Sequence, residues 1–117
     1  MYEISNQEEF DRAINSNRVV FVLYYWVRKN KETETFIETL KKLEEKSDPE
    51  VLFCSVDVNK LPALAPNKGS RPLLKVYYDG KVVFEQEGCL TDVDLNTQAV
   101  RRGLRSVFAQ LQVKVRF

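Results

Sequence analysis

The chain has 117 residues, 44% of them hydrophobic and 30% charged, and its 18 basic and 17 acidic residues leave a formal net charge of +1. These values are typical of one soluble globular domain, and the near-zero charge argues against attraction of the whole molecule to nucleic acid or acidic lipid. Histidine is absent and there are only two cysteines, which excludes Ser-His and Cys-His nucleophile pairs, histidine metal ligands and a four-ligand structural zinc site.

The first half of the sequence predicts two helices that alternate with two strands. Ser5 to Glu8 has the pattern of a capping box, which starts a helix, and apolar residues at helical spacing follow it. An unbroken apolar run rich in β-branched and aromatic residues is typical of a strand that is covered on both faces. On these patterns we expect helices over residues 6–15 and 31–46, strands over residues 19–26 and 51–58, and a short strand at residues 2–4.

The second half predicts a hairpin followed by a long helix. Asp79-Gly80 is a strong turn signal, so residues 73–78 and 81–86 are expected to pair as antiparallel strands. Residues 61–65 suit one short helical turn, the last helix is expected over residues 93–111, and residues 112–117 end the chain as a strand or a loose tail. This order predicts an α/β sandwich in one domain over residues 1–117: a mixed sheet of four to five strands with helices on both faces.

The start of the chain has no pattern of a targeting signal. Residues 1–9 are mostly polar and acidic, unlike a signal peptide. The longest apolar run, Val19 to Val27, has nine residues, which is less than half of a membrane span. We therefore expect a cytoplasmic protein without a membrane-spanning segment.

The order of the elements and several short motifs resemble those of the thioredoxin family. The resemblance covers about residues 4–111, and it implies a three-layer thioredoxin-like sandwich. The motifs that carry it are the buried strand ending in Trp26, Val56-Asp57-Val58-Asn59, Ala65-Pro66-Asn67-Lys68-Gly69, Pro72, Asp79-Gly80-Lys81, and Gly88 before the last helix.

The redox motif of that family, Trp-Cys-Gly-Pro-Cys-Lys, is altered here. Residues 26–31 read Trp-Val-Arg-Lys-Asn-Lys, so that Val27 and Asn30 stand in place of the two cysteines. The family's buried Asp and its Lys partner, which serve proton transfer, correspond to Phe21 and Ser55. Because the attacking thiolate and the resolving thiol are both missing, the resemblance implies a redox-inactive protein-interaction module rather than an enzyme.

A group of cations is expected to surround the altered motif. If the fold is as implied, Arg28, Lys29 and Lys31 meet Arg71 at the start of a helix, which favours an anionic ligand such as an acidic or phosphorylated peptide. The alternative is a solvated polar turn. The resemblance also implies a cis peptide bond at Pro72 and a partner-binding groove beside Trp26. The predicted partner-binding residues are Trp26, Arg28, Lys29, Lys31, Arg71 and Pro72, with Lys68 as a further candidate.

Two other functions are open on the sequence. Cys89 follows Gly88 in a loop and is the candidate for a reactive thiol, whereas Cys54 is expected to be a buried hydrophobe that does not pair with it. Nucleic-acid binding is the other alternative, through the cations named above and a stripe on the last helix formed by Arg101, Arg102 and Arg105. No metal or cofactor is expected, because the acidic residues are too scattered for a metal site.

Overall fold

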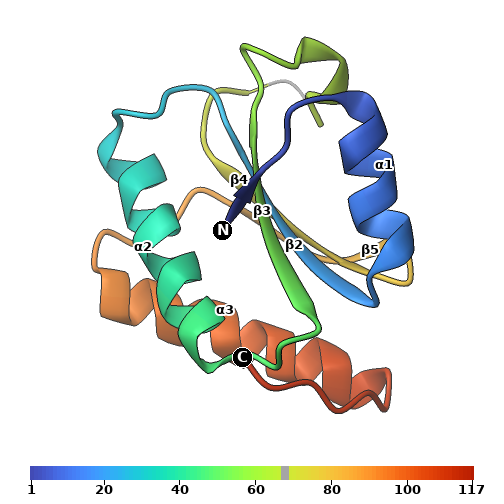
Figure 1. Ribbon diagram of the computed structural model, residues 1–117. Helices are drawn as coiled ribbons and strands as arrows, with labels where there is room; N and C mark the ends of the chain where they lie inside the picture. The colour runs from blue at the N-terminus through green and yellow to red at the C-terminus, as the bar shows by residue number, and fades with distance from the viewer. Residues whose placement is uncertain (67–68) are drawn as a thin grey trace.

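The fold is a five-stranded mixed sheet with three helices (Figure 1), seen in a computed structural model that describes residues 1–66 and 69–117. The strand order is β1-β3-β2-β4-β5, with β1, β3 and β2 parallel and β4 and β5 antiparallel to their neighbours. The predicted order of elements and the α/β class are confirmed. The elements are β1 (Tyr2–Glu3), α1 (Gln7–Ser16), β2 (Val19–Tyr25), α2 (Lys31–Lys46), β3 (Val51–Asp57), the single 3₁₀ turn η1 (Pro62–Leu64), β4 (Leu73–Tyr78), β5 (Lys81–Glu87) and α3 (Val93–Gln110).

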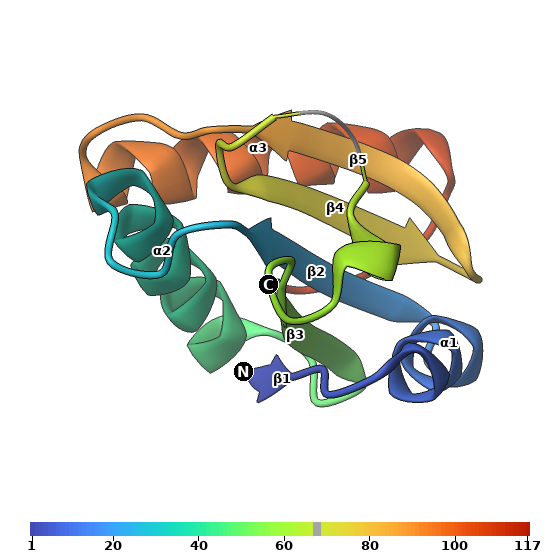
Figure 2. The same cartoon turned by 90° about the horizontal axis from the view of Figure 1, so that it is seen from above.

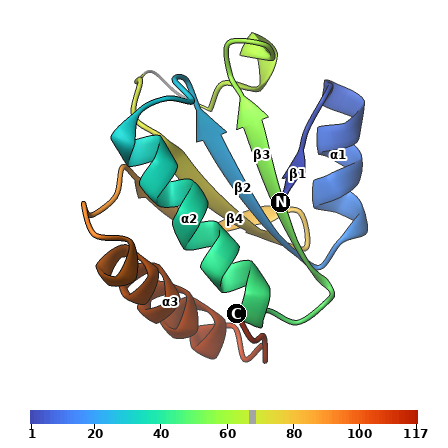
Figure 3. The same cartoon turned by 60° about the vertical axis from the view of Figure 1, so that its left-hand side comes forward.

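The sheet separates two hydrophobic cores, which makes the molecule three-layered. Because side chains alternate along a strand, Val19, Phe21 and Leu23 of β2 pack with α2 and α3. Val20, Val22 and Tyr24 of the same strand face the opposite side and pack with α1. Figures 2 and 3 show α2 and α3 on one face of the sheet and α1 on the other. In the described part of the chain, no helix has the length and apolar character that crossing a membrane requires.

The central strand β2 positions residues 26–31, which the resemblance aligns with the redox motif of the thioredoxin family. All seven of its residues are buried, and it pairs with β3 on one side and β4 on the other. The chain leaves β2 at Trp26 and enters α2 at Lys31. We call residues 26–30 the Trp26 loop. It therefore lies at the carboxyl edge of the parallel strands, the edge where α/β folds commonly bind ligands.

The first helix begins one residue later than the sequence pattern predicts. Asn6, rather than Ser5, is the N-cap, and its side chain accepts a hydrogen bond from the Glu9 amide at 2.8 Å. The Glu9 carboxylate accepts one from the Ser5 amide at 2.8 Å. The capping box is therefore shifted by one residue, because Asn caps as well as Ser and Glu9 also offers a carboxylate at the third helical position.

Residues 112–117, which we call the tail, are neither a strand nor loose. The Phe117 side chain is 5% exposed and packs against Phe21 and Phe108 at centroid distances of 6.1 and 6.0 Å. Hydrogen bonds join the main chain of the tail to Asp48: the Asp48 amide donates to the Arg116 carbonyl at 2.8 Å, and the Arg116 amide donates to Asp48 Oδ2 at 3.0 Å. The alternating pattern reflects three alternate side chains that pack against the core, Val113, Val115 and Phe117, and not pairing along a sheet edge.

Candidate functional site

Asn30 has a structural role at the start of α2. Its backbone is extended, and its side-chain oxygen accepts hydrogen bonds from the amides of Glu32 at 2.9 Å and Thr33 at 3.2 Å. These are two of the amides that a helix N-terminus leaves without partners. The residue at the position of the second redox cysteine therefore caps α2, and it takes up donors that an anionic ligand would otherwise use.

Trp26 and Val27 lie side by side in the loop but differ in exposure. Trp26 is half-buried against the α1-side core, and its carbonyl accepts a hydrogen bond from the Asn59 side chain. The Val27 side chain is 51% exposed. The loop is thus anchored to the segment after β3 at Trp26, while the position of the first redox cysteine presents an apolar group to solvent.

The predicted cations divide into two kinds. Arg28, Lys29 and Lys31 are exposed, and none of them forms an ion pair with another of the described residues. Arg71 does reach the start of α2, but it forms a two-pronged ion pair with Glu32, at 3.2 and 2.5 Å. Its charge is therefore largely compensated there. Lys68, the further candidate, lies outside the described residues.

Glu32 joins three segments that are far apart in the sequence. Its carboxylate accepts hydrogen bonds from Arg71 and from the Cys89 amide, the latter at 3.1 Å. The Arg71 hydrogen bond holds the pKa of Glu32 below its ordinary value, although partial burial opposes this shift. Sequence reasoning missed Glu32, because its partners lie 39 and 57 positions away and no local spacing indicates them.

Gly88 lets the Arg71 guanidinium lie close to the chain after β5. Gly88 has a φ of +68°, and a Cβ atom there would stand 2.0 Å from Arg71 Nη2. Its amide donates to the Pro72 carbonyl at 2.7 Å. A side chain at this position would displace the guanidinium and strain the backbone, so glycine is required by both the turn and the ion pair.

The expectation of a cis bond at Pro72 is wrong. No peptide bond among the described residues is cis. The trans form is the intrinsic preference of X-Pro bonds. Pro72 itself is buried and lies between Arg71, which pairs with Glu32, and Leu73, the first residue of β4.

Both cysteines are free, Cys54 being buried and Cys89 half-buried. The half-buried Cys89 donates from Sγ to the Glu32 carbonyl at 3.3 Å. Burial, with the charge of Glu32 adding to it, raises the pKa of Cys89 to about 11. Burial likewise raises the pKa of Cys54 to about 12. Both are therefore thiols near pH 7, whereas the attacking group in disulfide exchange is a thiolate.

The arginine stripe of α3 lies far from the Trp26 loop. Lys31 begins α2, whereas Arg101 shares a surface hollow with Lys42 and Lys46 near the end of that helix. A helix of 16 residues is about 24 Å long. The two basic regions are therefore separated by most of the length of α2. Within residues 1–66 and 69–117, no group of three or more acidic or cysteine side chains is placed to hold a metal ion.

Comparison with known proteins identifies the fold. No family model and no curated protein sequence matches the chain. Thioredoxin from Plasmodium falciparum matches in structure with a TM-score of 0.71 and 21% identity, over 87% of this chain and 96% of that one. Mitochondrial thioredoxin 3 from Saccharomyces cerevisiae matches with a TM-score of 0.69 and 19% identity, over 91% and 94%. At these identities the likeness concerns the fold alone, and the chain has a thioredoxin-like fold.

Proposed function

We propose that this chain is a redox-inactive protein of thioredoxin-like fold that binds a protein partner through the Trp26 loop without catalysing a reaction. The observation that carries the proposal is the composition of the loop, in which Val27 and Asn30 stand where the redox motif has cysteines. Thiol–disulfide exchange requires an attacking thiolate and a resolving thiol. An exposed valine and a helix-capping asparagine supply neither.

The exposed groups of the loop indicate the chemistry of the partner. Arg28, Lys29 and Lys31 offer three positive charges without ion-pair partners among the described residues. Because the Asn30 side chain already caps α2, recognition of an anion rests on these side chains rather than on helix amides. The proposed partner is a segment rich in carboxylates or phosphates, with Val27 and the exposed edge of Trp26 as apolar contacts.

The other two predicted residues, Arg71 and Pro72, lie at the border of this surface. Arg71 is committed to Glu32 and lies over Gly88, so its contribution is to hold the chain after β5 against the start of α2. The Pro72 carbonyl accepts a hydrogen bond from the Gly88 amide. In this proposal both residues shape the border of the binding surface.

The two alternative functions have less support. A redox role for Cys89 needs an accessible thiolate, but its thiol is half-buried and its pKa is raised to about 11. A nucleic-acid role needs a continuous basic track, but the two basic regions lie toward opposite ends of α2. Neither alternative explains why other residues, Val27 and Asn30, stand at both positions where the redox motif has cysteines.

The absence of redox activity is tested by an insulin reduction assay with dithiothreitol. The protein is expected to leave the rate of insulin precipitation at the level of dithiothreitol alone, while a thioredoxin with both cysteines accelerates it. Acceleration that disappears in a Cys89→Ser variant would replace the proposal by the Cys89 alternative.

The binding surface is tested by an NMR titration with a hexaglutamate peptide. We expect changes in the amide resonances of residues 26–31, which a hexalysine peptide does not produce. A variant with Arg28→Glu, Lys29→Glu and Lys31→Glu is expected to abolish them. The matched control, with Lys46→Glu, Lys81→Glu and Arg102→Glu, changes the same charge at exposed sites elsewhere and should keep them. Equal loss in both variants would mean that only net charge matters and would contradict a local site.

A further inference from the structure

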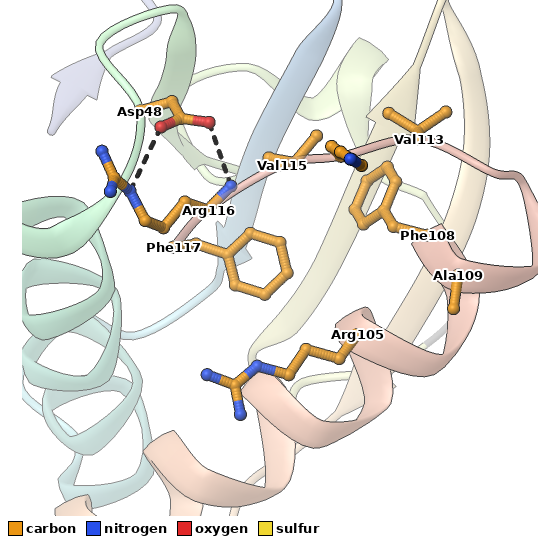
Figure 4. A pocket seen from close by; sticks show the side chains of 9 residues that line it. Asp48, Arg105, Phe108, Ala109, Val113, Val115, Arg116 and Phe117 are labelled. Atoms are coloured by element: carbon orange, nitrogen blue, oxygen red, sulfur yellow. Dashed lines mark hydrogen bonds and ion pairs between the residues drawn. The ribbon is translucent and has the colours of Figure 1, made fainter.

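A concave site lies between the tail and the last turns of α3, apart from the Trp26 loop (Figure 4). We call it the tail cavity; it has a volume of about 470 Å³. Its lining residues are Asp48, Arg105, Phe108, Ala109, Val113, Lys114, Val115, Arg116 and Phe117. Because Asp48 follows the end of α2 and the Trp26 loop precedes its start, this cavity is independent of the surface proposed above.

The walls of the tail cavity are held in place by the rest of the fold. Asp48 binds Arg116 through the two backbone hydrogen bonds described above and through an ion pair of 3.4 Å to Arg116 Nε. On the other side, Arg101 Nε donates to the main-chain oxygen of Phe117 at 3.0 Å. The Phe117 ring is buried against the core. A ligand would therefore meet a formed site and would not have to order the tail first.

The surface of the cavity is apolar at its floor and basic at its rim. Five of its nine lining residues are apolar: Ala109 is exposed, Val113 and Val115 are half-buried, and Phe108 and Phe117 are almost fully buried. Arg105 of α3 and Lys114 of the tail are exposed at the rim. In Figure 4 the ring of Phe117 lies between the side chains of Arg105 and Arg116.

The charge of the rim is not balanced by the residues that line it. The cavity has three cations and one carboxylate, and that carboxylate is already engaged by Arg116. Neither Arg105 nor Lys114 has an ion-pair partner in the part of the chain that the structure describes. Arg18 adds a further cation, since its Nη2 donates to the Lys114 carbonyl at 3.4 Å, although Glu50 pairs with it. The unbalanced charge at the rim is positive.

We propose that the tail cavity binds a small amphipathic anion, namely an aromatic ring system that carries a sulfonate, carboxylate or phosphate group. The volume is in the range of pockets that hold small organic molecules. The aromatic body packs on the accessible apolar residues of the floor, Ala109, Val113 and Val115, and the anionic group contacts Arg105 and Lys114 at the rim. Such a ligand makes apolar contacts with the floor and ion pairs with the rim at the same time. An inorganic anion lacks the first interaction and a neutral hydrocarbon lacks the second.

The probe for this site is anilinonaphthalene sulfonate, added to the folded chain of 117 residues. Isothermal titration calorimetry is expected to give saturable one-to-one binding. NMR spectra recorded during the same titration should show changes confined to the amides of residues 105–117 and Asp48, with the rest of the spectrum remaining that of the native protein. Phenylnaphthylamine, which has the same rings without the sulfonate, is expected to bind at least about tenfold more weakly because it lacks the charge.

Charge reversal at the rim distinguishes a site from general attraction. Arg105→Glu with Lys114→Glu is expected to weaken the sulfonate at least about tenfold. The matched control, Lys60→Glu with Lys81→Glu, reverses two exposed charges elsewhere and should leave its affinity unchanged. Equal weakening in both variants, equal affinity for both probes, or resonance changes spread over the whole molecule would each overturn the proposal. The hexaglutamate titration at the Trp26 loop is unaffected by any of these results.

Discussion

Glu32 is the residue at which the contacts around the start of α2 converge. Its carboxylate binds Arg71 and the Cys89 amide, and its carbonyl accepts the Cys89 thiol. A negative charge close to a thiol opposes loss of the thiol proton. The same carboxylate therefore binds the loop that carries Cys89 and adds to burial in raising the pKa of that thiol.

This arrangement predicts slow alkylation of Cys89. Its pKa of about 11, against an ordinary 9.0, gives a thiolate fraction about a hundredfold lower than in the unfolded chain near pH 8. Peptide-resolved mass spectrometry after iodoacetamide treatment at a series of pH values measures the rate. The rate should still be rising above pH 10, and Glu32→Gln should move the profile to lower pH. A plateau reached below pH 9 would contradict the assignment.

At the scale of elements, the last residue of the Trp26 loop, Asn30, is also the N-cap of α2. The Asn30 side chain caps the N-terminus of this helix, where it accepts hydrogen bonds from the amides of Glu32 and Thr33. Asn30→Ala is expected to lower the free energy of unfolding by about 1 kcal/mol, because two helix amides lose their acceptor. Urea unfolding measures this loss. Asn30→Asp keeps a capping oxygen and should be close to wild type; if the two variants lose equal stability, the cap is not the cause.

The tail is the second element whose role can be measured. Phe117→Ala is expected to destabilise the protein by about 3 kcal/mol, because it removes an aromatic ring packed against Phe21 and Phe108. Lys114→Ala, at an exposed tail position, should change the stability by less than about 0.5 kcal/mol. Urea unfolding of both variants gives the comparison. A loose tail would instead make the two substitutions equally harmless.

Local patterns predicted the elements better than the contacts between them. The bounds of α2 and β4 agree with the predicted ranges, because apolar periodicity and flanking polar residues act within a few positions. The ion pair of Arg71 with Glu32 and the anchoring of Phe117 join residues far apart in sequence, which no spacing encodes. The cis bond expected at Pro72 came from the resemblance alone, and the residues around Pro72 carry no local pattern that fixes the isomer.

For the whole molecule, paired carboxylates link stability to pH. Hydrogen bonds lower the pKa of Glu32, mainly through Arg71, and of Glu9, mainly through the Ser5 amide, below the ordinary 4.5. The folded state thus binds protons less readily than the unfolded state. The resulting stabilisation is complete above the unfolded pKa and is lost as pH falls through the folded values.

This linkage predicts a falling urea midpoint as the pH is lowered from 6 to 3. The Glu32→Gln variant should show a smaller fall than wild type, because one of the two linked carboxylates is gone. The difference in midpoint between the two proteins is therefore expected to be largest near neutral pH and to shrink in acid. A constant difference across this range would mean that the Glu32 charge does not stabilise the fold.

Trp26 is the only tryptophan of the chain, and it lies half-buried at the border of the Trp26 loop with its carbonyl tied to the segment after β3. The emission wavelength of an indole depends on its contact with water. A partner that covers the loop would remove that water and shift the intrinsic fluorescence to shorter wavelengths. The protein thus carries an unlabelled optical reporter at the surface proposed for its partner, and the occupancy of that surface can be followed in real time in dilute solution.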